Sequence, residues 1–144
     1  MRALKWAVLL AVLFVGITVA LTKIAGASAG GRVGFSGNPA TNAGQTCTSC
    51  HAAGAATPSV SVAGPAVVNA GATNSYVVTV SGGPGITGGF NASTSGYAGT
   101  FSPVDAETEV LAGEITHNNP KFFGGGQVQF TFDWTAPANN GVVT

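Results

Sequence analysis

The sequence predicts an all-β protein, an antiparallel sandwich or barrel that follows a loop-like segment. Short runs of alternating apolar and polar residues recur from Pro58 onward, Gly, Pro and Asn separate them, and no long helical pattern follows the first two dozen residues. The 144 residues allow one domain and little more. Charged residues make up 7% of the chain, against about 25% in typical proteins, and Gly contributes 22 residues. This composition excludes a coiled coil, a long helical bundle and a charged disordered tail.

Residues 1–29 are predicted to be an export signal. Two cationic residues precede an apolar run of 16 residues, from Trp6 to Leu21, and small residues then offer cleavage sites after Ala27 or Ala29. This order is typical of a secretory signal peptide. The run is shorter than the about 20 residues that a membrane-spanning helix needs, and an uncleaved N-terminal anchor is the alternative. We therefore expect an extracytoplasmic protein, in the periplasm, at the cell surface or secreted.

Cleavage after Ala29 would leave a sparsely charged, acidic chain. Its basic residues are Arg32 and Lys121, and its acidic residues number five, so the net charge is −3. Contact with a phosphate backbone needs clustered Lys and Arg, which excludes nucleic-acid binding. The same count excludes adhesion to an anionic membrane through basic residues.

Residues 30–57 form the next segment, which is rich in Gly, Ala, Asn, Ser and Thr. It contains Cys47 and Cys50, followed directly by His51, a CxxCH motif typical of c-type haem attachment. One helical turn would place both thiols on one side, where they add to the two vinyl groups of the porphyrin. His51 would then be the proximal iron ligand. Export supports this prediction, because haem is joined to such motifs outside the cytoplasm, where the thiols would otherwise oxidise.

Three other uses of the cysteines stay open. A disulfide between Cys47 and Cys50 would close a very small loop and add little stability. A thioredoxin-like redox pair would need a helix start within a βαβ pattern, which this sequence lacks. A zinc site would need four ligands, and the two cysteines, His51 and a distant His117 make a poor set.

The second axial ligand of the iron decides which kind of haem protein is expected. Met1 is the only methionine and leaves with the signal peptide, so internal His/Met ligation is excluded. The remaining candidates are His117, Lys121 and Tyr97, with an open or water-filled position as the default. By strand alternation His117 shares an inward face with Ile115, which favours a buried, hydrogen-bonded histidine over a distal iron ligand.

Residues 58–144 are predicted to form the sandwich domain. The expected strands lie near residues 59–62, 76–80, 86–93, 97–101, 108–117 and 128–134. In the last of these, four apolar residues from Val128 to Trp134 fall on one face, so burial fixes the strand register. A new apolar run begins at 141–144, after an Asn-Asn-Gly turn. We expect a truncated sandwich, with a partner chain at the open edge as the alternative.

The segments together resemble a known family, the bacterial choice-of-anchor V domain proteins. The resemblance rests on the CxxCH motif and on residues 113–117 (Gly-Glu-Ile-Thr-His), 130–137 (Phe-Thr-Phe-Asp-Trp-Thr-Ala-Pro) and 141–144 (Gly-Val-Val-Thr). It covers about residues 34–144 and implies an immunoglobulin-like, Reeler-like β-sandwich in the envelope or at the cell surface, usually tethered by a C-terminal anchor. Reeler-type domains carry a similar Thr-His strand end without a haem motif, which supports a structural role for His117.

The sequence thus predicts a secreted or envelope-associated monohaem c-type cytochrome that transfers electrons and is not an enzyme. It supplies no recognisable Ser/His/Asp set or acid/base pair. The alternatives are a haem-based sensor or weak peroxidase with an open sixth position, and a structural or adhesive surface sandwich. The expected partner is a redox protein of unknown identity, with envelope anchoring or self-association through the low-charge surface as further expectations.

Overall fold

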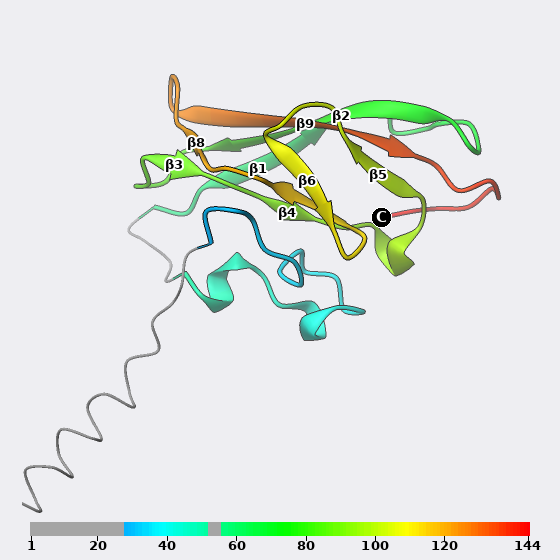
Figure 1. Cartoon of the computed structure of the whole chain (residues 1–144), viewed down its shortest axis with the longest axis horizontal. Coiled ribbons are helices and arrows are strands. Elements are labelled where there is room, and N and C mark those ends of the chain that lie inside the picture. Colours follow the sequence, from blue (N-terminus) through cyan, green and yellow to red (C-terminus); the bar gives the residue numbers. More distant parts are fainter. Residues whose placement is uncertain (1–27, 52–55) are drawn as a thin grey trace, which may run out of the picture.

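The computed structural model describes residues 28–51 and 56–144, which form antiparallel β-sheets and short 3-10 turns (Figure 1). The expected export signal, residues 1–29, lies outside these residues except for its last two positions. The strands are β1 (Ser59–Ala63), β2 (Thr73–Ser81), β3 (Thr87–Gly88), β4 (Asn91–Ala92), β5 (Thr100–Pro103), β6 (Thr108–Leu111), β7 (Glu114–His117), β8 (Lys121–Phe122) and β9 (Gln127–Thr135). The 3-10 turns are η1 (Asn42–Gly44), η2 (Cys47–Ser49) and η3 (Ser95–Tyr97). Across these two stretches no helix has the length and apolar character needed to cross a membrane.

The strands form two main sheets that share one apolar core. The larger sheet has the order β1-β2-β9-β5 and the smaller has the order β4-β7-β6, while β3 and β8 form a separate pair. β2 and β9 form the longest pairing, from Thr73 opposite Thr135 to Ser81 opposite Gln127. The predicted all-β antiparallel fold class is therefore confirmed, and the arrangement is consistent with a sandwich.

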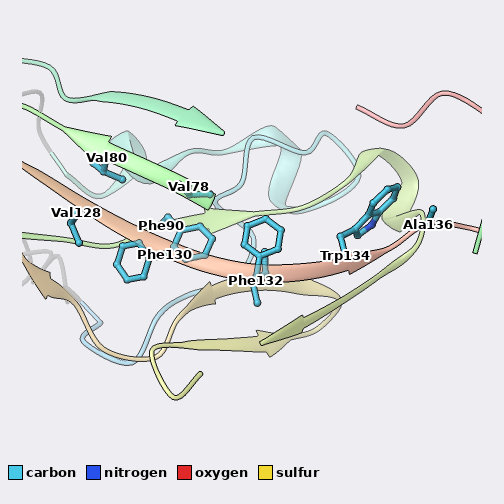
Figure 2. Close-up of a cluster of buried hydrophobic side chains, with 9 residues drawn as sticks. Val78, Val80, Phe90, Val128, Phe130, Phe132, Trp134 and Ala136 are labelled. Carbon is cyan, nitrogen blue, oxygen red and sulfur yellow. The ribbon is translucent and has the colours of Figure 1, made fainter. Parts of the chain in front are cut away.

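The alternate apolar residues of β9 lie in the centre of the core. Val128, Phe130, Phe132 and Trp134 are buried (Figure 2), while the residues between them are exposed or half-buried. Phe130 is fully buried, and its ring centroid lies 4.9 Å from that of Phe90. Burial of one such side chain stabilises the fold by about 1.5–3 kcal/mol. The predicted half-buried strand and its register are thus confirmed.

The expected single strand at 108–117 is wrong, because the chain folds there into the β6–β7 hairpin. Its two turn residues, Ala112 and Gly113, have φ angles of 49° and 83°. Two consecutive left-handed residues form the turns whose twist matches a tight hairpin. Alanine rarely adopts this conformation, which is why Ala112 gave no turn signal in the sequence.

Three other predicted strands also need correction. The run at 86–93 is broken into β3 and β4 by two residues, one of which is Gly89, and a side chain at Gly89 would overlap the ring of His117. The run at 97–101 begins instead as η3, and β5 starts at Thr100. Residues 141–144 form no strand. Thr144 is hydrogen-bonded to the η3 turn rather than to a sheet.

Candidate functional site

The CxxCH motif forms one tight turn at the surface. In η2 the carbonyl oxygen of Cys47 accepts hydrogen bonds from the N–H groups of Cys50, at 3.2 Å, and His51, at 3.0 Å. Both cysteines are free thiols on exposed residues, and His51 is exposed as well. The hydroxyls of Thr46 and Thr48 are 2.7 Å apart and close the same turn. Two reduced thiols and an imidazole are therefore accessible on a single turn.

The thiol of Cys47 differs from an ordinary surface thiol. Although the residue is exposed, partial desolvation of the sulfur raises its pKa, a backbone hydrogen bond lowers it and the neighbouring Cys50 raises it. The net direction is upward, so Cys47 holds its proton at neutral pH. Because the thiolate is the form that attacks disulfides and oxidants, this shift slows unwanted oxidation of the pair.

Glu114 in β7 fastens the cysteine-bearing segment to the sandwich. Its side chain is 0% exposed and accepts three hydrogen bonds from that segment. One carboxylate oxygen accepts from the N–H of Gly34 at 2.7 Å, and the other accepts from the hydroxyls of Ser36 at 2.9 Å and Thr41 at 3.1 Å. A hydrogen bond to a charged group contributes about 1.5–3 kcal/mol. This carboxylate is therefore the centre of the contact between segment and sheet.

Ser36 connects the Glu114 carboxylate to the CxxCH motif. Ser36, which donates to Glu114, also forms an antiparallel bridge with Thr46, the residue before Cys47. Beside it the N–H of Gly37 donates to the carbonyl oxygen of Gln45 at 3.0 Å. The path from the buried carboxylate to the first cysteine thus runs through one side-chain hydrogen bond and one backbone pairing.

Further hydrogen bonds spread the contact along the edge of the smaller sheet. The N–H of Phe35 donates to the side-chain oxygen of Asn91 at 3.0 Å, and the side-chain amide of Asn38 donates to the carbonyl oxygen of Thr94 at 3.1 Å. Figure 1 shows this segment, coloured blue to cyan, beneath the sandwich. β7 is consequently buried on both faces, with Ile115 in the core on one side and the segment on the other.

His117 lies on the core face of β7, as the alternation predicted. Its ring centroid is 6.2 Å from that of Phe130, and its Nδ1 atom is hydrogen-bonded to the backbone of Phe90. Nδ1 either accepts from the N–H of Phe90, at 3.1 Å, or donates to its carbonyl oxygen, at 3.0 Å, depending on the tautomer. Within residues 28–51 and 56–144, no hydrogen bond or ring contact joins His117 to the CxxCH turn. This geometry favours the structural histidine.

Lys121, the second candidate for distal ligand, is also engaged elsewhere. Its ammonium group forms an ion pair with Glu107 and donates to the carbonyl oxygen of Gln129 at 2.7 Å. It also lies 5.0 Å from the centre of the Phe130 ring. Contacts with described residues therefore hold the ammonium group of Lys121 where β8 and β9 lie side by side.

The zinc arrangement considered above is not assembled. Among the residues that the structure describes, no group of three or more His, Cys, Asp or Glu side chains is placed to hold a metal ion. Cys47, Cys50 and His51 therefore do not converge with His117 on one point. The donor set of the turn, two thiols with an adjacent imidazole, fits covalent haem attachment instead.

Sequence reasoning did not identify Glu114 as part of this site. A charged residue beside Ile115 on an alternating strand resembles an ordinary solvent-facing position. The donors that bury it lie about 80 positions earlier, in a segment without a hydrophobic pattern. Comparison of the chain with protein-family models, curated proteins and solved structures finds no match.

Proposed function

We propose that the protein is an extracytoplasmic monohaem c-type cytochrome that transfers electrons through haem attached to Cys47 and Cys50. The observation that carries this proposal is the turn at 47–51, which presents two free thiols and an imidazole at the surface. A disulfide or a buried zinc site would use these side chains differently. The expected export signal supports an oxidising compartment, where haem c is attached.

The residues of the turn would have separate tasks. Each thiol would add across one vinyl group of the haem, with sulfur bonding to one vinyl carbon and the hydrogen going to the other, without net oxidation. His51 would be the protein ligand of the iron. When bound, haem supplies a reversible one-electron couple. Because the residues of the turn are exposed, haem attached there would lie near the surface, where a redox partner protein could approach it.

The sandwich would act as a carrier for this turn. The anchor at Glu114 holds the segment on the smaller sheet and leaves the cysteines outside. We assign the sandwich to the immunoglobulin-like, Reeler-like type, and the chain to the choice-of-anchor V domain proteins, on the motifs described above. This assignment implies attachment to the cell envelope.

A second candidate function is a haem-based sensor or weak peroxidase with an open sixth position. It is favoured by the engagement of Lys121 with Glu107 and by the position of His117, whose Nδ1 atom is bonded to the backbone of Phe90 in the core and whose ring makes no hydrogen bond or ring contact with the described part of the CxxCH turn. Haem with one strong axial ligand is high-spin and binds carbon monoxide. The two candidates therefore differ in their spectra.

The test is the absorption spectrum of the protein purified from cells that mature c-type haem. We expect reduced haem c bands that are retained after denaturation, lost in the Cys47→Ser, Cys50→Ser double variant and kept in Thr48→Ala, the matched control within the turn. A colourless protein, or colour that survives in the double variant, would contradict the proposal. Bands that shift with carbon monoxide would select the sensor or peroxidase.

A His117→Gln variant refines the choice of axial ligand. Since His117 is hydrogen-bonded to the backbone in the core, we expect its replacement to lower stability and leave the haem spectrum unchanged. Conversion from low-spin to high-spin bands in this variant would instead identify His117 as the distal ligand.

A further inference from the structure

Residues of both main sheets line a cavity of about 660 Å³, which we call the sandwich cavity. Its walls include Val78 of β2, Ala92 of β4 and Phe132 of β9. Val78 and Phe132 are only 2% and 4% exposed, so the cavity reaches the apolar core. Sites for small molecules usually have volumes of about 300–1,000 Å³. The sandwich cavity therefore has the size of a small-molecule site.

The wall of the sandwich cavity is apolar and carries no charge. Valine, alanine and proline side chains make up most of it, together with four aromatic rings, and no lining residue is charged. At its outer part Val62, Val67 and Val142 are 62%, 89% and 91% exposed. Exposed apolar surface that gathers around a cavity is typical of a ligand-binding site. We expect an uncharged occupant, because a charge would lose its hydration there without a partner.

Polar groups in the wall already have partners within the chain. The hydroxyl of Tyr76 donates to the carbonyl oxygen of Pro65 at 3.1 Å. The indole N–H of Trp134 and the hydroxyl of Thr94 both donate to the carbonyl oxygen of Ala98, at 3.1 Å and 2.7 Å. A hydrocarbon placed against these side chains would leave all three hydrogen bonds intact, so no buried donor would lose its partner.

The backbone beside the cavity is engaged in the same way. The side-chain amide of Asn38 donates to the carbonyl oxygen of Thr94 at 3.1 Å. The N–H of Ser95 donates to the carbonyl oxygen of Thr144 at 2.6 Å, and the N–H of Thr144 donates to the Ser95 hydroxyl at 3.2 Å. The chain thus closes this side with its own residues 139–144, which line the cavity. This closure favours a small molecule over an added strand.

The lining also offers a place for one polar group. Asn139 and Asn140 line the cavity at exposed positions, and a side-chain amide both donates and accepts hydrogen bonds. A neutral head group can bond there and stay in contact with water while its chain lies deeper in the cavity.

We propose that the sandwich cavity binds an uncharged, single-chain amphiphile, with its hydrocarbon chain against Val78 and Phe132 and its hydroxyl or amide head group at Asn139 and Asn140. The inference does not depend on haem or on electron transfer.

Equilibrium dialysis of the full chain against decanol provides the test. We expect saturable binding of one decanol molecule per chain. A decanediol with a hydroxyl at each end of the chain should bind at least tenfold more weakly, because its second hydroxyl would be buried without a partner. Equal binding of the two alcohols, or no saturable binding of decanol, would overturn the proposal.

Ala92→Phe places a ring inside the cavity and should weaken decanol binding at least tenfold. Ala106→Phe adds the same ring at an exposed turn residue outside the lining, and as the matched control it should change the affinity less than twofold. Circular dichroism establishes that both variants are folded, and Val68→Phe, a second substitution in the lining, replaces Ala92→Phe if that variant is not. Equal binding by the two variants, or displacement of bound decanol by a peptide of alternating threonine and valine, would also overturn the proposal.

Discussion

Replacement of Glu114 by glutamine tests the anchor of the cysteine-bearing segment. The amide keeps one oxygen, which still accepts from Ser36 and Thr41, but it places an N–H₂ group against the N–H of Gly34. The change removes one hydrogen bond to a charged acceptor, worth about 1.5–3 kcal/mol, and makes the other two neutral. We expect the segment to be held less tightly by about 3 kcal/mol.

Amide hydrogen exchange over residues 30–51 measures this loss. A decrease of about 3 kcal/mol in the free energy of local opening corresponds to roughly 100-fold faster exchange, since each 1.4 kcal/mol is a factor of ten. The protection of β2 and β9 should change much less, because their hydrogen bonds and packing do not involve the segment.

Glu109→Gln on the neighbouring strand β6 is the matched control, because it removes the same charge at a position that is not fully buried. A substitution of this kind is expected to stay within about 0.5 kcal/mol. If exchange in the segment of Glu114→Gln is within twofold of the wild-type rate, or if Glu109→Gln has an equal effect, Glu114 is not the anchor.

Three further perturbations have defined outcomes. Phe130→Ala should lower the free energy of unfolding in urea by about 3–5 kcal/mol, because the ring is fully buried in the core, and a loss below 1 kcal/mol would disprove that packing. Gly99→Ala should lower it by more than 2 kcal/mol, because φ is 76° and the new methyl group would overlap the indole of Trp134, whereas an unchanged thermal midpoint would count against this geometry. In protein without haem, iodoacetamide should alkylate Cys47 more slowly than Cys50 near pH 8, because the raised pKa of Cys47 leaves less thiolate. Mass spectrometry measures both alkylation rates, and their difference should decrease as the pH rises. Equal rates at pH 8 would contradict the raised pKa.

The parts of the fold that could be predicted are those with local signals. Four apolar residues, from Val128 to Trp134, alternate along β9, and only one register buries all four. This local pattern therefore predicts both the strand and its buried face. The CxxCH spacing is equally local, and the structure has a 3-10 turn within the motif, at Cys47–Ser49. The short alternating runs separated by Gly, Pro and Asn predicted the all-β fold class.

The parts that could not be predicted depend on distant partners or on rare backbone conformations. Glu114 is buried by donors about 80 residues away, and its own neighbourhood in sequence contains no sign of them. The β6–β7 turn uses Ala112 with a positive φ, which the residue type does not suggest. The order of the larger sheet, in which β9 lies between β2 and β5, depends on long-range pairing that single runs of residues do not encode.

Two different kinds of interaction hold the 30–51 segment and the sandwich in place. The sandwich is held by apolar packing, whereas the segment is held by hydrogen bonds to Glu114, Asn91 and Thr94. The segment can open by itself, because its loss leaves the apolar packing of the sandwich intact, whereas opening of the sandwich also removes the partners of the segment. We therefore expect the segment to open at a lower free energy than the sandwich, so that the turn at 47–51 undocks while the core stays folded.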